Sequence, residues 1–431
     1  MDDTCPSDAA AQTQLAISHD GVGDGLVAQG NLKDALEAYI SSMEIRGRLL
    51  DSDPCNGARQ FNLSVSCMKM GGVLLAQGEL KRAHELYAAS VRIRENLNKA
   101  DPGNTYWQHA LAVSYSKIGE VLKAQGKLKD ARSIFRKSID LAEGLAKADP
   151  GNAVWQLNLS AYYMSIGEVL MDQGELPDAL DAFTKAIAIT EYLTSEDSGN
   201  AYWQQALSSN YATLAKILVR QGRLEDALDA STKGLAIGER LAKADPGKVD
   251  LQSNLSNLYI NGGKILLALG TLQPALDAFA DSLAVMDRLT RIDASNAGWQ
   301  IDLSASYFLI GCALTQQGKV QEALKAVTGS VAIRDRLLLT DPRNADWQRN
   351  LALGHAMIAQ LHVQAGDHAA AASALRKALA VADAMLKARM HLGTTISSQY
   401  SHWRERLVQL DAAAWAMSAQ TAKGGGVPPL H

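Results

Sequence analysis

Cysteine is scarce in this 431-residue chain, which contains Cys5, Cys55, Cys67 and Cys312 and no CxxC pair. Structural zinc sites and disulfide frameworks both require cysteines at suitable spacings, so both are disfavoured. The chain also has little excess of charge of either sign, because 46 acidic residues almost balance 42 basic ones. Such a chain lacks the strong positive field that attracts nucleic acid or anionic lipid, so neither is expected as a partner.

Long apolar runs are missing too, and this absence bears on location. No stretch reaches the roughly 18 apolar residues of a membrane-spanning helix. The first residues, MDDTCPSDAA, are acidic and lack the basic and apolar regions of a signal peptide. These features predict a soluble, cytoplasmic protein.

Motifs for catalysis or cofactor binding are absent as well. The sequence contains no phosphate-binding GxxxxGK[ST] loop, no HExxH and no GxSxG. His355 and His362 share a helix face, but a spacing of seven residues separates them by about 10 Å, too far for one metal ion. We therefore predict no enzymatic activity, no catalytic residue, no metal site and no cofactor.

The sequence does contain a strict repeat of 48 residues. Glycine recurs at this interval as Gly30, Gly78, Gly126, Gly174, Gly222, Gly270, Gly318 and Gly366. Glutamine stands 18 residues before each glycine, leucine 15 before it, and alanine five after it. A tryptophan column holds Trp107, Trp155, Trp203, Trp299 and Trp347. Such self-similarity is the signature of a repeat architecture.

Each repeat reads as two helices of about 20 residues. In one copy, apolar residues from Trp155 to Leu170 follow the i, i+3, i+4 spacing of a helix face. Asn152 precedes them as an N-cap, and Gly174 suits the left-handed residue that ends the helix. Pro177 lies in the first turn of the second helix, and Asp-Pro pairs end second helices in other copies. A helix pair of this kind must stack on its neighbours to bury its apolar stripes.

These columns resemble the tetratricopeptide repeat family, with 14 extra residues in each unit. The matching positions in one copy are Tyr163, Ile166, Gly167, Leu170, Ala179 and Phe183. The resemblance implies an all-α, right-handed α-solenoid of eight stacked helix-turn-helix repeats. We expect a flexible segment 1–8, repeats over 9–390, a C-terminal capping helix over 391–421 and a disordered tail 422–431. Burial of the tryptophan column predicts that Trp203→Ala costs about 3 to 5 kcal/mol.

The resemblance also implies that the first helices line a concave groove that binds protein. Residues expected to contact a partner there are Met68, Lys117, Glu120, Lys123, Met164, Glu168, Asp172, Lys216, Arg220, Ile260, Lys264 and Phe308. The acidic residues of this set would bind a basic segment of the partner, and the basic residues would bind an acidic segment. The methionines, Ile260 and Phe308 would supply apolar contact. The alternative is that Glu168 and Lys216 merely pair with each other on a solvated surface.

The sequence thus predicts a scaffold or adaptor that binds a peptide or helix of a partner protein. Two other functions stay open. Identical arrays could self-assemble into a structural array, which makes a homo-oligomer possible. The chain could also be the regulatory or sensor subunit of a separate effector, because the sequence contains no effector domain of its own.

Overall fold

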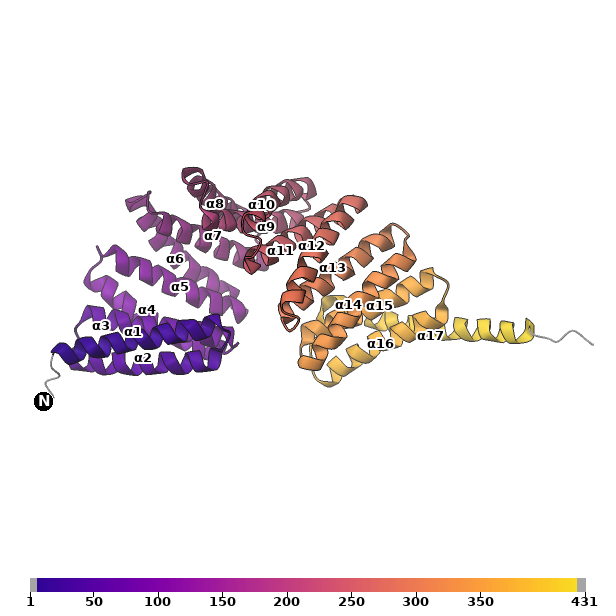
Figure 1. Cartoon of the computed structure of the whole chain (residues 1–431), viewed down its shortest axis with the longest axis horizontal. Helices are drawn as coiled ribbons and strands as arrows, with labels where there is room; N and C mark the ends of the chain where they lie inside the picture. The colour runs from indigo at the N-terminus through magenta and orange to yellow at the C-terminus, as the bar shows by residue number, and fades with distance from the viewer. Residues whose placement is uncertain (1–5, 425–431) are drawn as a thin grey trace, which may run out of the picture. The chain divides into compact units, whose positions relative to one another are not determined.

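A computed structural model describes the backbone of residues 6–424 and the side chains of 8–413. Over this range the chain forms α-helices and no strand (Figure 1). The helices are α1 Pro6–Ala28, α2 Leu32–Ser52, α3 Gly57–Ala76, α4 Leu80–Ala100, α5 Thr105–Ala124, α6 Leu128–Ala148, α7 Ala153–Gln173, α8 Leu176–Glu196, α9 Ala201–Arg220, α10 Leu224–Ala244, α11 Val249–Ala268, α12 Leu272–Ile292, α13 Ala297–Gln316, α14 Val320–Thr340, α15 Ala345–Gln364, α16 His368–Lys387 and α17 Gly393–Gly424. Odd-numbered helices are the first helices of the repeats, and even-numbered helices are the second.

The chain divides into two compact units, Met1–Gln221 with α1 to α9 and Gly222–His431 with α10 to α17. Within each unit every helix packs on the next one along the chain. Some first helices also contact each other directly: α5 with α7 and α7 with α9 in the first unit, α11 with α13 and α15 with α17 in the second. The all-α repeat fold predicted from the sequence is confirmed.

Local backbone geometry explains why the helices break where they do. The recurring glycines, including Gly174 at φ 82°, all adopt the left-handed conformation that favours glycine. At the start of six first helices an asparagine side chain accepts a hydrogen bond from the backbone amide three residues ahead; these caps are Asn56, Asn104, Asn152, Asn200, Asn296 and Asn344. Lys248 occupies the same position on α11 without a side-chain cap.

The glutamine column closes the turn between repeats. The side-chain amide nitrogen donates to the backbone carbonyl six residues earlier for Gln60, Gln108, Gln156, Gln204, Gln300 and Gln348. The carbonyls of this turn have no partner within a helix, so a donor at this position satisfies one of them. Gln252 departs from the pattern and donates to the carbonyl of Ala242 instead.

In five repeats a glycine of the first helix packs against an aromatic ring of the second helix. A Cβ atom at Gly167 would lie 2.5 Å from Cε1 of Phe183, and four other repeats show the same close approach. The rings are almost fully buried: Tyr39, Tyr87, Phe135, Phe183 and Phe279. Where alanine replaces the glycine, at Ala215 and Ala359, the ring is replaced by Ser231 and Leu375. The two positions therefore vary together, because one must be small for the other to be large.

The predicted burial of the tryptophan column needs correction. Trp107, Trp155, Trp203, Trp299 and Trp347 are each only half-buried. They lie in the first turn of the first helices, at the edge of the stack, where packing covers only part of the indole. The leucine column is more deeply buried, at 3 to 9% exposure from Leu111 to Leu351, but Leu15 in α1 is 47% exposed.

The chain ends also differ from the sequence prediction. Helix α1 begins at Pro6, inside the segment 1–8 that was predicted to be flexible. Proline suits the first position of a helix, and Asp8 in the first turn favours its N-terminus. Helix α17 spans Gly393–Gly424, so it extends three residues into the segment 422–431 predicted as a tail. Residues 425–431 lie outside the described range.

Candidate functional site

Acidic and basic side chains predicted to line the groove pair with one another in the first unit. Lys117 bonds Glu120 at 2.8 Å on α5, and Lys123 of α5 bonds Glu168 of α7. Each of these side chains is between 30 and 41% exposed. Exposed pairs of this kind contribute about 0 to 1 kcal/mol to stability. Glu168 therefore forms an ion pair within the chain, as the alternative interpretation predicted, but its partner is Lys123 and not Lys216.

The remaining charged candidates are exposed and differ in their contacts. Asp172 and Lys216 point into solvent on α7 and α9. Arg220 donates to the backbone carbonyl of Met171 at 3.0 Å, close to the C-terminus of α7, where a cation favours the helix dipole. Lys264 is exposed on α11 in the second unit.

Four apolar candidates were predicted to contact a partner, and the structure separates them. Met68, Met164 and Phe308 are half-buried on α3, α7 and α13. Ile260 is only 6% exposed, so the prediction that it contributes to the groove surface is wrong. Helix α11 packs against α10, α12 and α13, and Ile260 is buried within the second unit.

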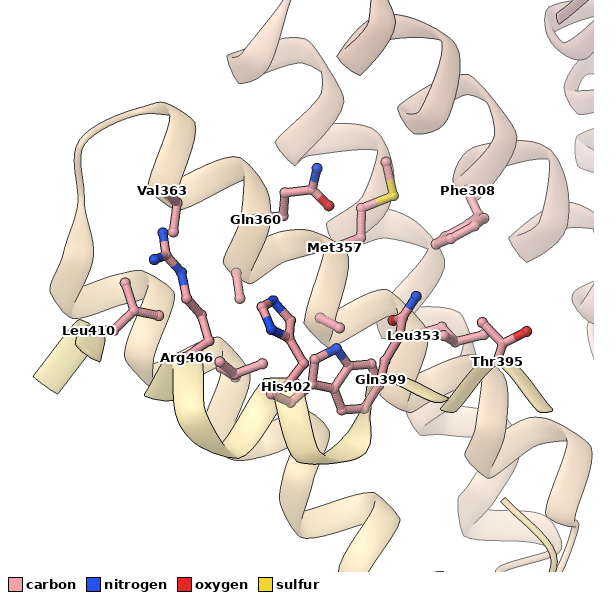
Figure 2. Close-up of a pocket in the computed structure, with 14 residues that line it drawn as sticks. Phe308, Leu353, Met357, Gln360, Val363, Thr395, Gln399, His402, Arg406 and Leu410 are labelled. Atoms are coloured by element: carbon pink, nitrogen blue, oxygen red, sulfur yellow. The ribbon is translucent and has the colours of Figure 1, made fainter. Parts of the chain in front are cut away.

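A largely apolar cavity lies in the second unit, between α13, α15, α16 and α17, with a volume of about 570 Å³. Phe308 closes one end, and Leu353, Met357 and Val363 of α15 form one wall (Figure 2). Trp403 of α17 also lines the cavity and is 5% exposed. Phe308 is the one predicted groove residue that lines this cavity.

The opposite wall is polar and comes from α17. Gln399, His402 and Arg406 follow each other at spacings of three and four residues, so they share one helix face. Figure 2 shows His402 and Arg406 rising from α17 towards α15, where Gln360 faces the same space. The cavity therefore combines an apolar floor with a polar edge that carries one guanidinium.

Arg406 differs from its neighbours in its partners. Arg404 pairs with Asp383 at 3.1 Å, and Arg376 pairs with Asp411. Arg406 donates to the side-chain carbonyl of Gln409 at 2.9 Å, and no carboxylate among the described side chains pairs with it. Its positive charge thus stays available at the edge of the cavity.

The wall from α17 exists because of an insertion in the sequence. Trp403-Arg404-Glu405-Arg406-Leu407 echoes the start of α15, but eight extra residues precede it. These residues extend α17 at its N-terminus back to Gly393, and they bring Thr395 and Gln399 to the cavity. Arg349 holds the preceding loop by donating to the carbonyl of His391 at 2.8 Å. The sequence predicted a capping helix here but not the cavity that this helix forms.

His355 and His362 also lie in the second unit, and His355 is 9% exposed. Burial lowers the pKa of His355, while the nearby Asp335 raises it by a smaller amount. Among the side chains described, no cluster of three or more His, Cys, Asp and Glu residues could hold a metal ion. His355 occupies the position held by tyrosine in five other repeats, which is a packing position.

Family models for the tetratricopeptide repeat match two segments, residues 111–149 and 354–384. The first covers parts of α5 and α6, and the second covers parts of α15 and α16, beside the cavity. The chain therefore contains tetratricopeptide repeats. Repeats of this family act as scaffolds for protein–protein interaction. No helix in the described range is long and apolar enough to cross a membrane.

Several solved structures are similar to this chain. BtubC (BKLC) from P. vanneervenii is 20% identical, with a TM-score of 0.48 over 60% of this chain and 92% of that chain. The apo form of RapI is 13% identical, with a TM-score of 0.49 over 75% and 98%. PilF from Pseudomonas aeruginosa is 13% identical, with a TM-score of 0.36 over 67% and 97%. No curated protein matches the sequence.

Proposed function

We propose that this protein is a scaffold whose cavity between α15 and α17 binds a segment of a partner protein. The bound segment carries a large apolar side chain with a carboxylate close to it. The observation that supports this proposal is the combination of an apolar floor with Arg406 at its edge and no carboxylate of the described chain paired with that residue.

The size of the cavity suits a side chain rather than a flat contact. Ligand cavities usually range from about 300 to 1,000 Å³, and a volume of about 570 Å³ accepts one or two large side chains. Burial of apolar area contributes about 25 cal/mol per Å². Met357 can adjust to different apolar shapes because its side chain is unbranched and flexible.

Arg406 supplies the selectivity for a carboxylate. A guanidinium presents donors in a planar fork that matches the two oxygens of a carboxylate, and such charge-assisted bonds are about twice as strong as neutral ones. Lysine or arginine at the same place in a partner would bring two positive charges together. The proposal therefore excludes basic segments from the cavity.

Binding fits this cavity better than catalysis does. The ionisable side chains in its lining are His402 and Arg406, and no acidic residue lies among them. General acid–base catalysis needs a proton donor and acceptor aimed at a reacting atom, and nucleophilic catalysis needs a nucleophile beside a base. Folds of the tetratricopeptide type are typically non-catalytic.

The groove of the first unit is a weaker candidate. Its central charges, Lys117, Glu120, Lys123 and Glu168, already pair with each other. A partner would have to break these pairs before it gained new ones.

The proposal can be tested with displayed random peptides selected on the full chain. Peptides that bind are expected to contain a large apolar residue within a few positions of Asp or Glu. Their affinity, measured by fluorescence anisotropy, should fall at least tenfold in Arg406→Glu and in Phe308→Asp. Val408→Glu is the matched control, because Val408 is 71% exposed on the same helix and does not line the cavity. Equal binding by Arg406→Glu and the wild type would overturn the proposal.

A further inference from the structure

Helix α1 exposes a surface whose counterparts in the other repeats are buried or half-buried. In the first helices from α3 to α15, residues in the columns of Leu15, Ser18, Val22 and Gly25 pack against the preceding second helix. Leucines of the first column are 3 to 9% exposed from α5 to α15, whereas Leu15 is 47% exposed. In the column of Val22, which is 56% exposed, Met70 and Ile118 are 9 and 6% exposed.

The exposed residues form a seam along the helix. Ala11, Leu15, Ser18, Val22 and Gly25 are all exposed and follow each other at spacings of four and three. This spacing places them on one face and is the spacing by which two helices pack side by side. Small residues at three of the five positions let a second helix approach closely.

Charge is almost absent from this surface. The exposed residues of α1 from position 10 to 25 are Ala10, Ala11, Gln14, Leu15, Ile17, Ser18, Gly21, Val22, Asp24 and Gly25. Asp24 is the only charged member, and it is held by Lys69 at 2.5 Å and by the hydroxyl of Tyr39 at 2.7 Å. A surface helix normally carries charged residues on its outer face, and a helix that is apolar all round is normally buried. The composition of α1 is thus that of a covered helix.

We infer that a second copy of this chain covers the seam, with α1 packed against α1 about a two-fold axis. A two-fold contact requires a surface complementary to itself, and an uncharged seam meets that requirement because no charge faces a like charge. An axis near Ser18 sets Leu15 of one copy beside Val22 of the other. The other terminal helix, α17, exposes Arg404 and Glu405. It is a poor match for an uncharged seam, which disfavours stacking of copies from end to end.

The length of the seam sets the expected strength. A helix of 23 residues is about 35 Å long and about 10 Å wide, so the contact covers on the order of 400 Å² per copy. Stable interfaces usually bury about 800 Å² per partner. A contact of about half that area predicts a weak, reversible dimer. This inference is independent of the cavity in the second unit, so either proposal can fail without the other.

Sedimentation of the full chain over the micromolar range tests the dimer. The wild type is expected to rise from 46.1 kDa towards twice that mass as concentration increases. Val22→Glu should stay monomeric with an unchanged circular dichroism spectrum, since Val22 is exposed in the monomer. Val408→Glu, on α17, should dimerise as the wild type does. A wild type that is monomeric throughout, a Val22→Glu variant that still dimerises, or loss of the dimer in Val408→Glu would each overturn the inference.

Discussion

Replacing Gly167 by alanine tests the packing at the centre of a repeat. A Cβ atom there would lie 2.5 Å from Cε1 and 2.8 Å from Cδ1 of Phe183, whereas carbon atoms normally pack at about 3.5 to 4.0 Å. Phe183 is fully buried, so its ring cannot move away freely. Overpacking of this kind costs about 1 to 3 kcal/mol, and the higher helix propensity of alanine returns about 1 kcal/mol. Because the approach is so close, we expect a net loss of about 2 kcal/mol.

Urea unfolding followed by circular dichroism measures this loss, and two further variants sharpen it. Gly144→Ala is the matched control: Gly144 is helical, and an added Cβ meets nothing within 4 Å, so a gain of about 0.5 to 1 kcal/mol is expected. The double variant Gly167→Ala with Phe183→Leu copies the pair Ala359 and Leu375 of the eighth repeat. The free energy of unfolding that the double variant loses should be smaller than the sum of the two single losses by at least about 0.5 kcal/mol. Strict additivity, or a Gly167→Ala variant as stable as the wild type, would refute the packing argument.

Three other predictions concern stability. Lys248→Asn should add about 1 kcal/mol to the free energy of unfolding, because it supplies the N-cap that α11 lacks; no gain in urea unfolding would count against this role. Trp403→Ala should lower the free energy of unfolding by about 3 to 5 kcal/mol. Trp203 is half-buried, so Trp203→Ala should lower it by only about half as much, and equal losses would contradict the difference in burial. Burial holds the folded-state pKa of His355 below its usual 6.5, so the unfolded chain takes up the proton first as pH falls. The stability from His355 is therefore present above about pH 6.5 and is lost as pH falls below it. His355→Tyr should reduce the loss of stability from neutral pH to about pH 5.5, and an unchanged loss would contradict this origin.

Local features of the fold could be predicted because they depend on a few neighbouring residues. A glycine such as Gly174 ends a helix through its own backbone conformation, and Asn152 caps the next helix through an amide three residues ahead. The repeat then shows each signal again at a fixed interval. Helix bounds within the repeats and the all-α architecture follow from these signals, whereas the start of α1 and the end of α17 do not.

Features that depend on the distance between helices could not be predicted in the same way. Ile260 is buried, whereas Met164 and Phe308 in the same column are half-buried, and the column pattern does not encode this difference. Glu168 pairs with Lys123 of α5 and not with Lys216 of α9, and this choice depends on the distances between neighbouring first helices. The cavity depends on α17, whose eight-residue insertion occurs once and offers no second copy for comparison. Phe308 could be predicted because it lies on a first helix, which the family resemblance places along the groove.

Peptide selection on the wild-type chain, with Arg406→Glu as the competitor, tests the central claim most directly. The account predicts that selected peptides share a large apolar residue near Asp or Glu and bind the wild type at least tenfold more tightly than Arg406→Glu. Peptides with no such pattern, or with equal affinity for both proteins, would contradict the assignment of the cavity as a binding site.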